Sequence, residues 1–216
     1  MDSFVNHIKV TRTARYYILG DNSLPPEILI YVLHGYGMKA KKFIHEFENL
    51  IKPGVWVIAP EGLSRFYQKG FSGEVVASWM TSDDRLLEID DYVAYLDAVH
   101  NSVVSGKHTK VIILGFSQGA ATASRWITKG NVNPEEFVIW GGEFAFDVTN
   151  LPSKLPKIRL VHALQDEFIS HQSFLEQSRR LELAGFEVEK LEFEGTHAIE
   201  KEILSNVFQS IDHKFY

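Results

Sequence analysis

The sequence contains no cysteine among its 216 residues, which excludes disulfide bonds and thiolate metal sites. It also lacks any run near the roughly 20 apolar residues that a membrane-spanning helix needs. No apolar core follows a basic start in its first residues, so we expect no secretory signal peptide. The default expectation is a cytoplasmic protein without a membrane span.

The sequence has no excess of basic charge. Lys and Arg number 22 against 28 Asp and Glu, for a net charge of -6, which argues against nucleic acid or an anionic membrane as the main partner. Hydrophobic residues make up 45% of the chain, enough for a sizeable core. We see no repeat, linker or low-complexity segment and expect a single domain over residues 1–216. Both a monomer and a homodimer remain open.

Short apolar runs alternate with helical patterns along most of the chain. This alternation predicts an α/β fold, with a mainly parallel sheet and helices on both faces. The expected strands cover residues 4–9, 11–19, 28–33, 55–59, 111–114, 137–140, 158–163 and 186–193. The expected helices cover residues 39–50, 83–104, 120–126, 170–183 and 198–211, and residues 60–80 are expected to form a long irregular stretch.

The segment Gly115-Phe116-Ser117-Gln118-Gly119 lies between an expected buried strand and a helix of small residues. Gly-x-Ser-x-Gly alone is a weak signal, since it occurs by chance in about 7 of 100 chains of this length. At a tight strand-to-helix turn, however, a serine hydroxyl projects into open space, and the two glycines let strand and helix approach. We therefore interpret Ser117 as a candidate nucleophile, with a purely structural turn as the alternative.

A nucleophilic serine needs a histidine base, which in this architecture follows the last strand. His197 follows the expected strand 186–193 and precedes the final helix, which is the required place. His162 lies within an apolar strand and is expected to be a core residue, and His171 begins a helix and is expected to be solvated. The sequence thus indicates His197 as the base.

The base in turn needs an acid that orients it, and the acid comes between the serine and the histidine in the chain. Asp166 directly follows the expected strand 158–163 and is our candidate. Glu143 and Asp147, which follow the preceding strand, remain alternatives that could assist or replace it.

An oxyanion hole needs two backbone N–H groups. We expect one from Gln118, the residue after the nucleophile, and the other from Tyr36 in the loop Leu33-His34-Gly35-Tyr36-Gly37. The two glycines of this loop would let the backbone turn towards the serine. We interpret the His34 side chain as structural.

Together these motifs resemble the phospholipase/carboxylesterase family of α/β-hydrolases, which includes bacterial carboxylesterases and acyl-protein thioesterases. The resemblance rests on Leu33-His34-Gly35-Tyr36-Gly37, Gly115-Phe116-Ser117-Gln118-Gly119-Ala120, Asp166 and Gly195-Thr196-His197. It implies the α/β-hydrolase fold, a triad of Ser117, Asp166 and His197, and hydrolysis through an acyl-enzyme. Neither a metal nor an organic cofactor would be required.

The sequence departs from the family where the substrate would bind. Trp79-Met80-Thr81 stands where the family often has Trp-Tyr-Asp, and Trp140-Gly141-Gly142 stands where it often has Ser-Gly. We expect four aromatic residues to line an apolar pocket: Trp79, Phe168, Phe144 and Phe66. The predicted substrate is a small-molecule ester with a short to medium acyl chain. A thioester or lysophospholipid substrate, or a non-catalytic binding protein on the same fold, are the alternatives.

Overall fold

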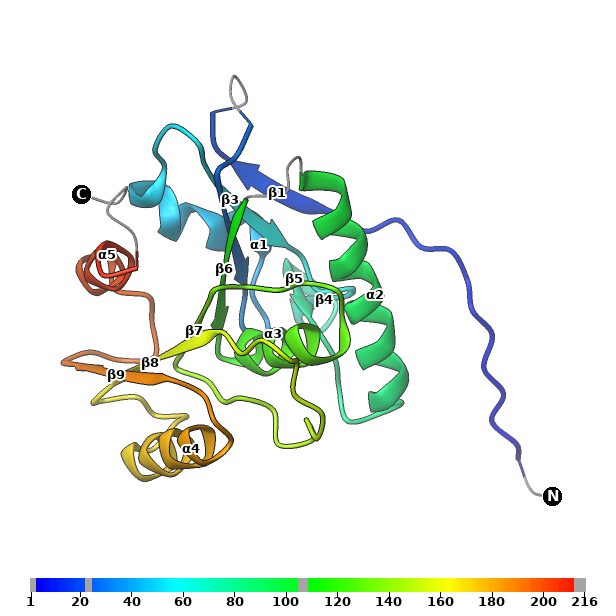
Figure 1. Cartoon of the computed structure of the whole chain (residues 1–216). Coiled ribbons are helices and arrows are strands. Elements are labelled where there is room, and N and C mark those ends of the chain that lie inside the picture. The colour runs from blue at the N-terminus through cyan, green and yellow to red at the C-terminus, as the bar shows by residue number, and fades with distance from the viewer. Residues whose placement is uncertain (1–2, 22–24, 105–108, 212–216) are drawn as a thin grey trace.

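The computed structural model describes residues 3–21, 25–104 and 109–211 of the chain. Within these residues the centre is a seven-stranded sheet in the order β1-β3-β2-β6-β7-β8-β9 (Figure 1). Its edge strand β1 pairs antiparallel with β3, and every other neighbouring pair is parallel. The strands are β1 (Tyr16–Leu19), β2 (Ile28–Leu33), β3 (Val55–Pro60), β6 (Lys110–Phe116), β7 (Glu136–Trp140), β8 (Lys157–Ala163) and β9 (Val188–Phe193).

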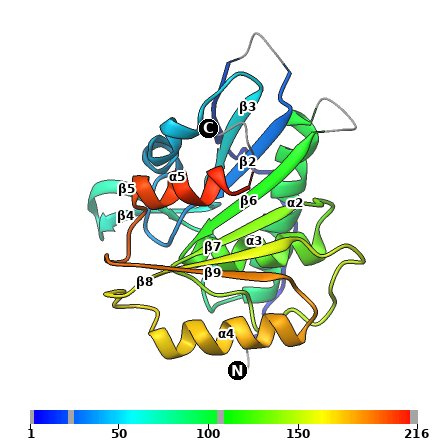
Figure 2. The same ribbon diagram turned by 60° about the vertical axis from the view of Figure 1, so that its left-hand side comes forward.

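Helices cover both faces of this sheet (Figure 2). They are α1 (Ala40–Phe43), which continues as the 3-10 helix η1 (Ile44–Leu50), α2 (Arg85–Val103), α3 (Gln118–Lys129), α4 (His171–Leu183) and α5 (Lys201–Gln209). In the described ranges no helix is both long and apolar enough to cross a bilayer. The predicted α/β class is confirmed.

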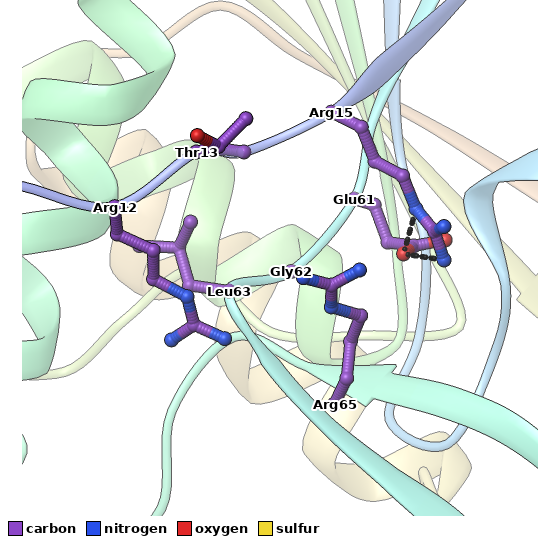
Figure 3. A pocket seen from close by; sticks show the side chains of 8 residues that line it. Arg12, Thr13, Arg15, Glu61, Gly62, Leu63 and Arg65 are labelled. Carbon is purple, nitrogen blue, oxygen red and sulfur yellow. Dashed lines mark hydrogen bonds and ion pairs between the residues drawn. The ribbon is translucent and has the colours of Figure 1, made fainter.

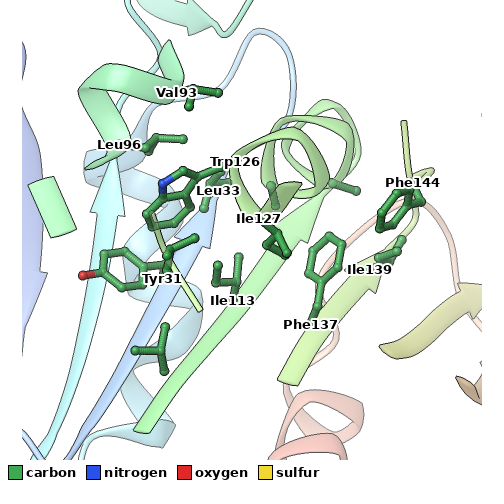
Figure 4. Close-up of a cluster of buried hydrophobic side chains, with 14 of the residues drawn as sticks. Tyr31, Leu33, Val93, Leu96, Ile113, Trp126, Ile127, Phe137, Ile139 and Phe144 are labelled. Atoms are coloured by element: carbon green, nitrogen blue, oxygen red, sulfur yellow. The ribbon is translucent and has the colours of Figure 1, made fainter. Parts of the chain in front are cut away.

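The alternation of side chains along β2 explains why the sheet has two cores. Leu29, Tyr31 and Leu33 face the core under α2, α3 and α4, which also contains Trp126 and Phe137 (Figure 4). The intervening residues Ile28, Ile30 and Val32 face the second core under α1, η1 and α5. Both sets are apolar because successive side chains of a strand point to opposite faces, and here both faces are buried.

The segment predicted as a long irregular stretch instead contains a hairpin. Strands β4 (Ser64–Lys69) and β5 (Ser72–Ser78) pair antiparallel in a separate two-stranded sheet. The turn uses Gly70, whose φ of 71° suits a glycine. The sequence of β4 lacks the apolar run that marks the central strands, because all of its residues are half-buried or exposed and need not be apolar.

The prediction of two strands at the start of the chain is wrong in its larger part. Only Tyr16–Leu19 forms a strand, and residues 3–15 have no regular structure. Phe4 and Ile8 are 85% and 87% exposed. Alternation alone does not make a strand when no neighbouring strand receives its backbone hydrogen bonds.

Parallel strands place all their carboxyl ends at one edge of the sheet, where ligands bind in this architecture. His34 follows β2, Ser117 follows β6, and His197 comes four residues after β9. The Asp166 loop follows β8 at the same edge.

Candidate active site

Ser117 occupies a strained turn between β6 and α3. Its backbone has φ 53° and ψ −119°, which is unusual for a residue with a side chain. The turn is forced by close packing: a Cβ on Gly119 would lie 2.1 Å from the Leu33 carbonyl oxygen. A Cβ on Gly115 would lie 2.4 Å from the Cα of Ala120. Only glycine fits at either position, as the motif predicted.

The turn also frees the serine side chain. Serine at the residue before a helix ordinarily caps it with its hydroxyl. Ser117 makes no such bond, and its backbone N–H instead donates to the Trp140 carbonyl at 3.0 Å. The hydroxyl therefore remains available for another partner at the carboxyl edge of the sheet.

His197 and Asp166 form a part-buried hydrogen-bonded pair. The Nδ1 atom of His197 lies 2.8 Å from Oδ2 of Asp166, whose side chain is fully buried. The other carboxylate oxygen, Oδ1, accepts the backbone N–H groups of Phe168 at 2.8 Å and Ile169 at 2.9 Å. The structure thus brings together two of the three residues that the sequence assigned to a triad.

Burial opposes ionisation of Asp166, but the hydrogen bonds from His197, Ile169 and Phe168 outweigh it and hold the pKa of this carboxyl below its ordinary value. Asp166 is therefore a carboxylate at neutral pH and can only accept hydrogen bonds. The proton between the two side chains therefore belongs to Nδ1 of His197, which donates it to Oδ2 of Asp166.

Two glycines after β7 fit between this pair and the serine turn. A Cβ on Gly141 would lie 3.1 Å from Nδ1 of His197 and 3.2 Å from Oδ2 of Asp166. A Cβ on Gly142 would lie 2.6 Å from the Ser117 carbonyl oxygen. These contacts place the serine turn and the His–Asp pair against one short segment, where a larger side chain would clash.

The imidazole of His197 lies between two phenyl rings. The ring centroid of Phe116 is 4.8 Å from that of His197, and the ring of Phe168 is 4.7 Å away. Phe168 was predicted near the site, whereas Phe116 was not. Its position inside the Gly-x-Ser-x-Gly motif was the only available signal.

The loop after β2 lies directly against the serine. A Cβ on Gly35 would lie 3.2 Å from the Cβ of Ser117. The loop is paired with β5, because Gly37 N–H donates to the Ala77 carbonyl and Ala77 N–H to the Met38 carbonyl, both at 2.9 Å. The backbone N–H of Tyr36 meets no acceptor among the described residues.

The backbone N–H of Gln118 is likewise without an acceptor in the described part of the chain, while its side chain is fully engaged. Oε1 accepts the Trp79 N–H at 3.1 Å, and Nε2 donates to the Met80 carbonyl at 2.9 Å. Gln118 therefore ties the serine turn to the end of the β4–β5 hairpin. The sequence indicated only its backbone role.

Two of the four residues predicted to line a pocket are instead core residues. Trp79 is 1% exposed, with its ring stacked on that of His34 at 5.0 Å between centroids. Phe144 is 4% exposed and packs in the core beside Phe137 (Figure 4). Both follow the carboxyl ends of strands, but their rings turn inward, where apolar area is removed from water.

The other two predicted pocket residues lie near the surface. Phe168 is 69% exposed beside His197. Phe66 is half-buried on β4, with its ring 5.4 Å from that of Tyr36. Phe168 thus lies beside His197, and Phe66 lies beside Tyr36 in the loop after β2.

The alternative acids lie in other surroundings. Asp147 accepts hydrogen bonds from Arg125 at 3.0 Å and Arg85 at 2.8 Å, so its carboxylate is already paired. Glu143 is half-buried and lies close enough to Arg180 to raise the pKa of that guanidinium, although burial lowers it more. Neither carboxylate is bonded to His197, whose acceptor is Asp166.

A cavity of about 190 Å³ opens beside Gly37 and Met38 of the loop after β2. Neither Ser117 nor His197 lines this cavity. Its lining residues are Gly37, Met38, Lys39, Lys42, Phe43, Glu46, Gln68, Glu74 and Val76. The described ranges contain no cluster of three His, Asp or Glu residues suited to a metal ion.

Comparisons with known proteins give a fold but no sequence family. No protein-family model and no curated protein matches the chain. The solved structure of esterase PE8 superposes with a TM-score of 0.72 at 18% identity, over 93% of this chain and 98% of that one. Acyl-protein thioesterase 2 of Zea mays gives a TM-score of 0.70 at 20% identity, over 94% of this chain and 100% of that one. A carboxylesterase from Mesorhizobium loti gives 0.72 at 16% identity, over 92% and 94%. The chain therefore has the α/β-hydrolase fold, which it shares with esterases and acyl-protein thioesterases.

Proposed function

We propose that this chain is a serine hydrolase of the phospholipase/carboxylesterase family that cleaves small carboxylic esters through an acyl-enzyme. The observation that carries the proposal is the 2.8 Å bond between His197 and a buried Asp166, at the same sheet edge as the strained turn of Ser117. A structural turn alone would not require a paired imidazole beside it. The bond from the Ser117 hydroxyl to His197 Nε2, which completes the triad, is part of the proposal.

In the first half of the reaction, Nε2 of His197 takes the proton of the Ser117 hydroxyl while Oγ attacks the acyl carbon. The negative charge that develops on the acyl oxygen accepts hydrogen bonds from the N–H groups of Tyr36 and Gln118. The carboxylate of Asp166 stabilises the imidazolium without taking its proton. His197 then gives that proton to the leaving alcohol, and the acyl group stays on Ser117.

In the second half, His197 takes a proton from water, which attacks the acyl-enzyme. The same two N–H groups bind the second oxyanion. Return of the proton to Ser117 Oγ releases the carboxylic acid. Each proton is moved by His197, and no step requires a metal or an organic cofactor.

The aromatic residues beside the proposed base favour a short to medium acyl chain. The rings of Phe116 and Phe168 both lie against the imidazole of His197. Aromatic bulk at this position would shorten a pocket for the acyl chain. The fold shared with an acyl-protein thioesterase keeps acyl thioesters as the second candidate substrate.

The test is hydrolysis of p-nitrophenyl esters with two to sixteen acyl carbons, together with acyl thioesters and a lysophospholipid. We expect Ser117→Ala to lower kcat by at least about 10³-fold. A fluorophosphonate probe should label the native protein and not the variant. Ser153→Ala removes an exposed serine in the loop before β8 and serves as the matched control.

Equal labelling of the native and Ser117→Ala proteins would remove Ser117 from the role of nucleophile. A native protein that turns over no ester or thioester would support a binding protein on the same fold. An optimum at twelve or more acyl carbons would overturn the short-chain substrate and favour a lysophospholipase or a long-chain thioesterase.

A further inference from the structure

We propose that His34 is a positioning residue of the oxyanion hole, which holds the Gly35–Tyr36 peptide so that the Tyr36 N–H faces the site. This inference rests on the proposed function and adds a residue to its machinery. His34 is fully buried, so it touches neither solvent nor substrate. It can therefore affect the reaction only through the backbone to which it is hydrogen-bonded.

The hydrogen bonds of His34 determine which ring nitrogen carries the proton. The backbone N–H of Gly62, which can only donate, points at Nε2 at 3.0 Å. Nε2 is therefore unprotonated and accepts. The proton then belongs to Nδ1, which donates to the Gly35 carbonyl oxygen at 2.7 Å. Burial lowers the pKa of His34 to about 4, against the opposing effects of the Gly35 bond and Glu61, so the ring is neutral at pH 7.

The bond to Gly35 orients the next N–H group. In a trans peptide the C=O and N–H lie in one plane and point in opposite directions. Fixing the Gly35 oxygen towards the His34 ring therefore turns the Tyr36 N–H away from the ring. That N–H meets no acceptor within the described residues, and Gly35 itself lies against Ser117. An unpaired donor held beside a nucleophile is what an oxyanion hole requires.

His34 is itself held on several sides. The indole N–H of Trp79 donates to the His34 carbonyl at 2.8 Å, and the two rings stack. The Gly62 loop is fixed by an ion pair of 2.6 Å between Arg15 and the buried Glu61 (Figure 3). A Cβ on Gly62 would lie 2.5 Å from the Ser78 carbonyl oxygen, so this loop cannot shift towards the hairpin. The ring that orients the Tyr36 peptide thus has little freedom to move.

Two substitutions of His34 test its two hydrogen bonds one at a time. In His34→Asn, the amide nitrogen takes the place of Nδ1 and can still donate to Gly35, while the acceptor for Gly62 is lost. In His34→Gln, the amide oxygen takes the place of Nε2 and can accept from Gly62, while the donor to Gly35 is lost. Each variant loses one buried hydrogen bond, which makes them matched controls for stability.

We expect His34→Gln to lower kcat about 10²-fold, the lower end of the loss when one oxyanion donor is removed, with KM changed less than about threefold. His34→Asn should recover at least about tenfold of that loss. Both should unfold at lower urea concentration than the native protein. Equal kcat values for the two variants, or a loss confined to KM, would overturn the proposal.

A measurement on the native protein keeps the test independent of whether the variants fold. Nitrogen-15 NMR of the histidine rings should find His34 protonated at Nδ1 and not at Nε2. The opposite tautomer would contradict the positioning role. A native protein without esterase activity or fluorophosphonate labelling would instead refute the proposed function, so the two failures are distinguishable.

Discussion

Ser117 stands immediately before α3, yet its hydroxyl does not cap the helix. A φ of 53° costs a residue with a side chain on the order of 1–3 kcal/mol, so the surrounding structure must impose it. The absent Cβ atoms of Gly115 and Gly119 allow strand and helix to press together and force the turn. The Ser117 hydroxyl is thus left without a capping bond at the sheet edge that also carries Asp166 and His197.

Asp166 is the residue whose role can be isolated most cleanly. Asp166→Asn keeps the shape of the side chain but removes the charge that holds the Nδ1 proton of His197. We expect kcat to fall by roughly 10³–10⁴-fold, because the imidazole would adopt the wrong tautomer. Steady-state hydrolysis of a short p-nitrophenyl ester measures it.

Asp147→Asn is the matched control. Asp147 lies between Arg125 and Arg85, so its loss should lower stability and leave the His197 bond intact. We expect its kcat to stay within about threefold of the native value. Should Asp147→Asn lose as much activity as Asp166→Asn, the acid would have been assigned to the wrong carboxylate.

The sequence could identify the residues that chemistry constrains, because strand order and motif spacing limit where a serine, an acid and a base can stand. Asp166 and His197 are brought together as expected, and the glycines of the motif fit as predicted. The burial of Trp79 could not be read from the sequence. Its ring direction depends on His34, which is distant in the chain.

At the scale of elements, the contact between α3 and β2 sets the position of the Ser117 turn. Gly119→Ala would place a methyl group 2.1 Å from the Leu33 carbonyl oxygen and must push the helix away. We expect a loss of about 1–3 kcal/mol in the free energy of unfolding. Fluorophosphonate labelling should slow as well, since the turn relaxes. Urea unfolding and labelling rates measure the two effects.

Gly70→Ala is the control, because Gly70 has a positive φ but nothing within 4 Å of an added Cβ. It should lose about 1 kcal/mol from backbone strain and label at the native rate. If Gly119→Ala were as mild as Gly70→Ala, the close approach of helix and strand would not determine the turn.

Elements buried on both faces were predictable, and those with little burial were not. The runs at 28–33 and 111–114 became β2 and β6 because a continuous apolar run is stable only where both of its faces are buried. The β4–β5 hairpin carries mixed residues, and its pairing depends on a turn at Gly70 that a sequence pattern does not distinguish from a loop.

At the scale of the molecule, the parallel sheet explains how residues far apart in the chain form one site. The ends of β2, β6, β8 and β9 meet at one edge, and each contributes one polar residue to it. The same arrangement buries imidazole groups next to the core. His34 and His162 are at most 2% exposed. Burial lowers the pKa of both histidines, so the folded chain binds a proton at these side chains less readily than the unfolded chain does. The free energy of unfolding therefore depends on pH.

Burial lowers the pKa of His34 to about 4. An imidazole in the unfolded chain titrates near about 6.5, so between these values the unfolded chain binds more protons than the folded one. The stabilisation from a neutral His34 is therefore fully present above about pH 6.5 and is lost as the pH falls towards 4. His162, whose pKa is also lowered by burial, acts in the same direction. The lowered carboxyl pKa values of Asp147 and Asp166 affect stability only in more acidic solution.

We expect the free energy of unfolding to fall by roughly 2–3 kcal/mol between pH 7 and pH 4.5 on account of His34 alone. Urea denaturation at the two pH values measures the total decrease. In His34→Asn this decrease should be smaller by the same amount, because the asparagine does not titrate. The variant would thus be less stable than the native protein at pH 7 and closer to it at pH 4.5. An identical decrease in both proteins would mean that His34 does not change its protonation when the chain unfolds.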